Sequence, residues 1–210
     1  MKDLRKLSSI ELDALKELLF VAGANAGNVL SKIIGCEIKI QSPEIAIIDI
    51  SNIPSFIGDP KEIVIGIYSK LLGENFAGLL LIMPIKAAEE VYKLVTKNYE
   101  QISDEVLSVV GRSALMEVGN IIFAAIVNVL SRYIGRNLFI SVPKLALDIP
   151  PAIVDVILSE IALESDCAIM IEVLMSDIGR QTNFKMFVIP DLEATEEILK
   201  ALEKYILDKK

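Results

Sequence analysis

The sequence repeats itself at an offset of 100 residues, and this internal repeat limits the possible folds more than any other feature. Positions 13–46 and 113–146 align without a gap and share 13 identities in 34 positions, including an identical Asn-Val-Leu-Ser string. Two copies are too few for a solenoid, in which several neighbouring units bury one another. We therefore expect one pseudo-two-fold domain, with a first repeat at about 8–100 and a second at about 101–210.

Each repeat begins with the pattern of a long helix. In the second repeat, apolar residues recur at steps of three and four between positions 115 and 129, which indicates one buried helix stripe. Ser103, followed by two acidic residues, fits a helix N-cap. Gly135 fits the C-cap, and Gly35 occupies the same place in the first repeat.

Short extended runs follow both helices. A proline, Pro43 or Pro143, separates the first two runs of each repeat, which fits a strand junction because proline donates no ladder hydrogen bond. The second repeat alone inserts Pro150 and Pro151 before a helical pattern that reaches residue 161. The predicted class is α+β, with long helices packed on a mostly antiparallel sheet. The expected strands are 37–41, 45–50, 63–72, 76–83, 138–142, 145–149, 168–175 and 184–189, with turns at 73–75 and 179–181 and closing helices at 87–96 and 195–207.

Composition excludes several classes of function. The chain has no histidine, so Ser-His-Asp triads, Cys-His dyads and histidine-bearing metal sites are excluded. Its 29 acidic and 21 basic residues give a formal net charge of -8, which lacks the positive footprint of a nucleic-acid binder.

No membrane span or targeting segment is expected. The most apolar stretch, residues 114–130, is interrupted by Glu117 and two asparagines, and a charge at the bilayer centre costs at least about 2.5 kcal/mol. Charged residues throughout the first 16 positions leave no room for a signal core. Cys36 and Cys167 form no CxxC pair and fit buried thiols in a reducing compartment, so we expect a cytoplasmic protein.

The long helix of the second repeat also carries a polar stripe. Steps of four and three place Ser113, Glu117 and Asn120 on one face. Gly119 and Ala124 flank them, so we expect a low surface that another protein could approach closely. The alternative is an ordinary solvated helix face. Asn and Gly together at a helix centre favour a functional role, because both are poor helix formers.

The spacing of this stripe resembles a known signature. Ser113-xxx-Glu117-xx-Asn120, followed by 22 residues and Pro143, resembles the active-site signature of the CheC/CheX/FliY phosphatases of bacterial and archaeal chemotaxis. The first repeat keeps the frame but has Phe20 where the signature has Asn. The resemblance covers nearly the whole chain, since the CheC type is itself a duplicated pseudo-symmetric unit of about this length.

The resemblance implies a substrate and a role for each residue. The substrate is phosphorylated CheY, a response regulator that carries an aspartyl phosphate and its own Mg²⁺, so this chain needs no metal or cofactor. Asn120 would orient the attacking water, as a glutamine does in small GTPases, and Glu117 would pair with a lysine of CheY. Ser113 and Pro143 would be structural or peripheral, with Ser113 as a docking candidate. In the first repeat, Asp13 and Glu17 are docking candidates as well, with plain solvation as the alternative for Glu17.

Other readings stay open at the level of sequence. The family resemblance implies CheD as a further partner, although no residue of the chain identifies it. A non-catalytic adaptor that binds CheY or CheD is the main alternative, because the first repeat has lost its amide at Phe20. A plain α+β domain for a small ligand lacks a convergent site. We expect a CheC type rather than FliY, since the chain ends at Lys210, and a monomer rather than a CheX-like dimer of single units.

Overall fold

The helices and strands follow the order that the repeat predicts. The computed structural model describes residues 4–41, 44–57, 59–72, 77–97, 108–161, 167–177 and 180–208. In the first repeat these residues form 3-10 turns (Leu4–Lys6 and Ile50–Asn52), α1 (Ser9–Ile34), β1 (Lys39–Gln41), β2 (Ile45–Asp49), α2 (Ile53–Ile57), β3 (Val64–Leu72), β4 (Ala77–Pro84) and α3 (Ile85–Thr96). In the second they form α4 (Val109–Ile134), β5 (Phe139–Ile140), β6 (Lys144–Asp148), α5 (Pro150–Ile161), β7 (Cys167–Asp177), β8 (Arg180–Pro190) and α6 (Leu192–Asp208).

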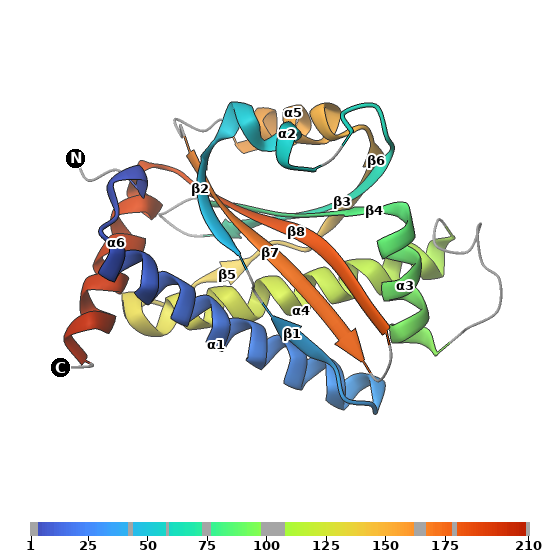
Figure 1. Cartoon of the computed structure of the whole chain (residues 1–210), viewed down its shortest axis with the longest axis horizontal. Helices are drawn as coiled ribbons and strands as arrows, with labels where there is room; N and C mark the ends of the chain where they lie inside the picture. The colour runs from blue at the N-terminus through green and yellow to red at the C-terminus, as the bar shows by residue number, and fades with distance from the viewer. Residues whose placement is uncertain are drawn as a thin grey trace.

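One curled antiparallel sheet joins strands from both halves of the chain (Figure 1). The strand order is β1-β7-β8-β4-β3-β5, with β2 also paired to β7 and β6 also paired to β3. Each half therefore gives its first two strands to the hairpin of the other half, and β4 pairs with β8 at the centre. All pairings among the described strands are antiparallel, which confirms the α+β class. The division into two repeats stays a prediction, and its boundary near residue 100 lies outside the described residues.

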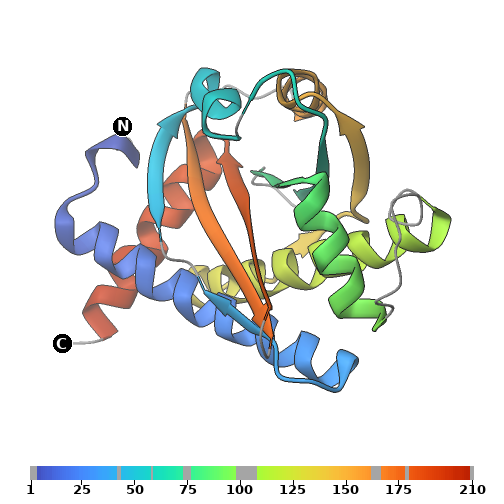
Figure 2. The same ribbon diagram turned by 45° about the vertical axis from the view of Figure 1, so that its right-hand side comes forward.

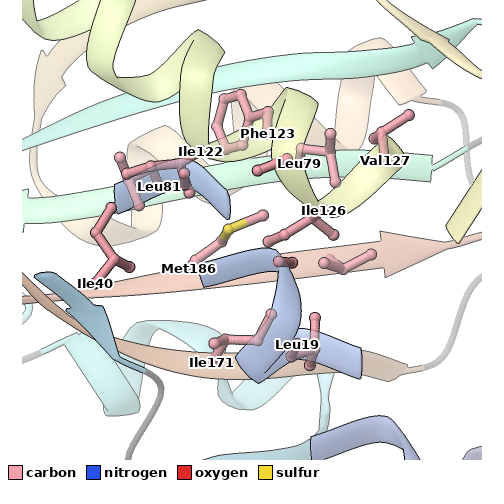
Figure 3. Close-up of a cluster of buried hydrophobic side chains, with 14 of the residues drawn as sticks. Leu19, Ile40, Leu79, Leu81, Ile122, Phe123, Ile126, Val127, Ile171 and Met186 are labelled. Carbon is pink, nitrogen blue, oxygen red and sulfur yellow. The ribbon is translucent and has the colours of Figure 1, made fainter. Parts of the chain in front are cut away.

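Helices cover both faces of the sheet, and the longer helices lie on one face. The long helices α1 and α4 lie side by side against one face, together with α3 and α6 (Figure 2). The shorter α2 and α5 cover the other face. The larger core lies between the long helices and the sheet, where Phe123 and Val127 of α4 meet Leu79 and Leu81 of β4 and Met186 of β8 (Figure 3). Strands β3 and β4 are thus buried on both faces, which explains their nearly continuous apolar sequence.

The long helices have matching ends. Ser8 caps α1 in a capping box with Glu11, and Ser108 caps α4 by accepting a hydrogen bond from the Gly111 N–H at 3.0 Å. At the other end, Gly35 and Gly135 have φ of 72° and 77°, a left-handed conformation that glycine adopts without strain. The predicted C-caps are therefore confirmed at both helices.

Four local predictions were wrong or concern residues outside the described ranges. The N-cap of α4 is Ser108 and not Ser103, which lies outside the described residues. Arg180 and Gln181, predicted as turn residues, belong to β8, because the ladder between β7 and β8 extends to the pair Asp177–Arg180, and Gly179 lies outside the described residues. The predicted turn at 73–75 and the predicted strand junction at Pro43 lie outside the described residues, whereas Pro143 does separate β5 from β6.

Candidate functional site

The polar stripe of α4 opens onto a surface hollow. Ser113 and Glu117 are exposed, Asn120 is half-buried, and all three line this hollow together with the buried Pro143. The hollow has a volume of about 350 Å³. Side chains 23 or more positions apart in the sequence therefore meet where the helix faces the corner between β5 and β6. We call this hollow the α4 hollow, and its lining residues are Ser113, Met116, Glu117, Asn120, Ile140, Ser141, Val142 and Pro143.

Local hydrogen bonds fix the strand side of the α4 hollow. After the left-handed Gly135, the chain reverses and the Leu138 N–H donates to the Ser131 hydroxyl at 2.9 Å. Further along, the Lys70 N–H of β3 donates to the Ser141 hydroxyl at 3.0 Å. The Ser69 hydroxyl, which is buried, donates to the Ser141 carbonyl at 2.8 Å. These bonds hold the corner between β5 and β6 in one place relative to α4, so the hollow is preorganised.

Gly119 has a different role from the one its sequence position suggested. It does not lower the outer surface beside Asn120, because it is buried on the inner side of α4. A Cβ at this position would lie 2.8 Å from Cγ2 of Ile67 on β3. Gly119 therefore allows α4 to pack closely on the sheet, and this contact sets the height of the catalytic candidates above the core.

The carboxylate of Glu117 and the amide of Asn120 line the α4 hollow without a polar partner among the residues that the structure describes. An exposed carboxylate can pair with a cation of an incoming protein. The half-buried amide can both donate and accept hydrogen bonds without titrating. The described residues contain no cluster of three or more His, Cys, Asp or Glu side chains that could hold a metal ion.

The equivalent face of α1 has a different character. Asp13 and Glu17 are exposed, and Phe20 exposes 61% of its surface. Asp13 pairs with Lys16 one turn later, with an N···O distance of 3.8 Å, and Glu17 has a polar contact within its own chain. The structure thus brings Asp13, Glu17 and Phe20 onto one surface but places no amide there.

The strand after α1 also lies closer to its helix. A Cβ at Gly23 would meet the carbonyl oxygen of Ile40 at 3.2 Å, and a Cβ at Gly27 would meet that of Ile38 at 2.9 Å. The positions equivalent to the two glycines in α4 carry Phe123 and Val127, which are buried. Such side chains leave no room for a backbone at this distance, so β5 cannot approach α4 as β1 approaches α1.

Sequence reasoning missed half of the α4 hollow. Met116, Ile140, Ser141 and Val142 line it although only the polar stripe and Pro143 were singled out. A signal was present in the repeat itself, because Met116 stands opposite Lys16 and Val142 opposite a serine in the alignment of the two copies.

The helix that carries the site is unusually apolar. Among the described residues, α4 is the one helix long and apolar enough to cross a membrane, and 61% of its most apolar window is buried inside the fold.

Comparisons with known proteins agree with the family resemblance that the spacing of Ser113, Glu117, Asn120 and Pro143 indicates. Residues 110–146 match the CheC-like family, a segment that spans the polar stripe and Pro143. The chain is 24% identical over 198 residues to the CheY-P phosphatase CheC of Bacillus subtilis, covering 91% of this chain and 93% of that protein. Among solved structures, Thermotoga maritima FliY has a TM-score of 0.73 at 19% identity, covering 95% of this chain and 99% of that one. A chain of the CheX-CheY-BeF3-Mg²⁺ complex of Borrelia burgdorferi has a TM-score of 0.52 at 19% identity, covering 83% and 96%.

Proposed function

Because the chain belongs to the CheC/CheX/FliY family, we propose that it is a chemotaxis phosphatase that hydrolyses the aspartyl phosphate of CheY. Its relative in Bacillus subtilis is a CheY-P phosphatase. The observation that carries the proposal is the α4 hollow, where a carboxylate and an amide that have no polar partner among the described residues lie beside Pro143. This arrangement suits a protein substrate whose reactive group must be reached by a side chain.

In the proposed reaction, each of the two proteins supplies different groups. CheY supplies the phosphoryl group and the Mg²⁺ that stabilises its charge. Asn120 reaches the phosphoryl group and holds a water molecule in line with the bond between phosphorus and the aspartate oxygen. That water attacks phosphorus, the bond to the aspartate oxygen breaks, and inorganic phosphate and a free carboxylate result. Since an amide does not titrate, Asn120 positions this water without acting as a base, which fits a chain without histidine.

Glu117 has a docking role in this scheme. It lies one helical turn before Asn120, and i,i+3 spacing places both side chains on one face. A lysine of CheY that pairs with the exposed Glu117 would fix the register in which Asn120 enters the partner's site. Ser113, one turn further back and exposed, extends the same contact surface.

The test is the decay of phosphorylated CheY in Mg²⁺ with and without this protein. The wild type should accelerate the decay, and Asn120→Ala should remove about 100-fold of the acceleration, the size of one lost transition-state contact. Asn128→Ala is the matched control, because Asn128 is exposed on the same helix outside the α4 hollow and should leave the rate unchanged.

Two outcomes would contradict the proposal. If the wild-type protein leaves the decay of phosphorylated CheY unchanged, the assignment as a phosphatase is wrong. Binding to CheY without acceleration would then favour a non-catalytic adaptor. If Asn120→Ala accelerates decay as well as wild type does, the activity exists but its assignment to Asn120 fails.

A further inference from the structure

Two apolar side chains distinguish the α4 hollow from the equivalent positions of the first repeat. At an offset of 100, Met116 stands opposite Lys16 and Val142 opposite Ser42. Glu117 and Pro143, by contrast, are identical to their counterparts. The half with the amide therefore also has apolar side chains at these two positions, where the first repeat has polar ones.

Val142 is held in an exposed position that the fold itself does not need. It exposes 85% of its surface although its neighbours on both sides are fixed. Ser141 is bonded to Ser69 and Lys70 of β3, and Pro143 is buried. A single exposed apolar side chain is common on protein surfaces, but Val142 lines the same hollow as Met116, and the two together offer a partner an apolar surface beside Asn120.

Met116 approaches the same hollow from the helix side. It is half-buried and lies one turn before Asn120, so i,i+4 spacing places the two side chains next to each other. Val142 lines the hollow from the corner of the strands. In the first repeat Lys16, at the place of Met116, instead pairs with Asp13 and is solvated. A thioether adapts its shape to an apolar partner surface, whereas an ammonium group resists being buried.

We propose that Met116 and Val142 form an apolar clamp that binds a hydrophobic patch of phosphorylated CheY beside its phosphorylation site. This inference rests on the proposed function and adds the basis of partner selection to it. The clamp supplies binding, and Asn120 between the helix and the strand corner acts on the phosphoryl group. The partner's surface should accordingly present apolar side chains next to its acidic Mg²⁺ pocket, with a cation opposite Glu117.

The experiment replaces each clamp residue with the residue of the first repeat. Met116→Lys and Val142→Ser should each raise KM for phosphorylated CheY about tenfold, because each removes the burial of one apolar side chain on binding. The Kd for CheY loaded with Mg²⁺ and beryllofluoride should rise equally. Val142→Ser should keep kcat within about twofold, whereas Asn120→Ala lowers kcat.

Controls separate loss of a contact from loss of the fold. Val156→Ser makes the same chemical change at a half-exposed valine on α5, on the other face of the sheet, and should leave Kd unchanged. Met116→Leu conserves volume and should keep Kd within about twofold of wild type. Circular dichroism of all variants should match that of the wild type.

The result can separate this inference from the proposed function. If the wild type accelerates the decay while Met116→Lys and Val142→Ser keep wild-type KM and Kd, the proposed apolar clamp is wrong, but the proposed phosphatase activity is supported. If the wild type binds CheY without accelerating decay, the phosphatase fails, and a tenfold rise in Kd for both variants still supports the clamp. If the wild type neither binds nor accelerates, both proposals are overturned.

Discussion

Helices α1 and α4 share their frame and differ in their surface. Both are 26 residues long, begin after a capping serine and end at a left-handed glycine. Ser31 and Ser131 each accept a hydrogen bond from the N–H of the residue just before the next strand, Ile38 at 2.8 Å and Leu138 at 2.9 Å. The outer faces nevertheless diverge, because α4 presents an amide and α1 presents Phe20.

The comparison separates the residues that build the fold from those that act on a partner. Caps, C-cap glycines and the bridging serines recur because both halves must place a strand beside a helix. Surface positions are free of that constraint and have diverged. Exchanging surface residues between the two halves should therefore change phosphatase activity with little effect on stability. Exchanging residues that lie at the contact of helix and strand should instead lower stability with little effect on activity.

The largest effect should come from giving α4 the first-repeat residue at its centre. Asn120→Phe removes the only proposed water-orienting group, so the accelerated decay of phosphorylated CheY should fall by about 100-fold or more. Because the equivalent Phe20 is tolerated at 61% exposure, the fold should survive, and urea denaturation should give nearly the wild-type free energy of unfolding. Phe20→Ala is the matched control, with full phosphatase activity expected. Substantial activity in Asn120→Phe would show that the two faces do not differ in the way proposed.

The converse exchange should affect stability instead. In Gly27→Val, which copies Val127, the new Cβ would lie 2.9 Å from the carbonyl oxygen of Ile38. That backbone cannot easily yield, since the Ile38 N–H is held by Ser31. We expect a loss of about 3 kcal/mol in the free energy of unfolding, measured by urea titration. Ala24→Val, at an exposed position of α1, should cost less than about 1 kcal/mol. Equal losses in the two variants would contradict the close packing of β1 on α1.

The contrast also explains which parts of this structure could be predicted from sequence. Periodicity and the repeat were enough for the order of helices and strands, because these depend on local pattern. Pairing of β1 and β2 with β7 of the other half depends on contacts more than 100 residues apart, which local pattern does not encode. The start of α4 was placed five residues early, because two acidic residues follow Ser103, whereas two valines follow Ser108.

The helical side of the candidate site was more predictable than its strand side, where Pro143 was the one residue singled out from the sequence. Helical spacing is regular, so Ser113, Glu117 and Asn120 could be placed on one face from their numbers alone. The strand side depends on a corner whose direction is set by the hydrogen bonds of Ser141 to β3. Sequence periodicity does not predict such a corner, so the place of Val142 at the rim of the hollow could not be predicted from the sequence.

A smaller effect should distinguish the two bridging serines. Ser31→Ala and Ser131→Ala each leave a backbone N–H without its hydroxyl partner, and each should cost about 1 to 2 kcal/mol of stability. Only Ser131 positions the strand that carries the rim of the α4 hollow. Ser131→Ala should therefore also raise KM for phosphorylated CheY, while Ser31→Ala leaves steady-state kinetics unchanged. A rise in KM for both variants would mean that general loosening, and not the geometry of the α4 hollow, controls binding.

The smallest expected change is a gain on the silent face. Phe20→Asn places an amide three residues after Glu17, in the frame of α4, but Lys16 still stands where the apolar contact is needed and Glu17 already has a contact within the chain. In the wild type the decay rate should rise less than twofold, so the gain is best measured in the Asn120→Ala background, where any recovery must come from α1. Adding Lys16→Met should increase that recovery, because it supplies one side of the clamp. If the triple variant stays as slow as Asn120→Ala alone, the difference between the faces lies deeper than these side chains. The close approach of β1 at Gly23 and Gly27, which leaves α1 without the spacing that Phe123 and Val127 impose, would then be the feature that silences the first repeat.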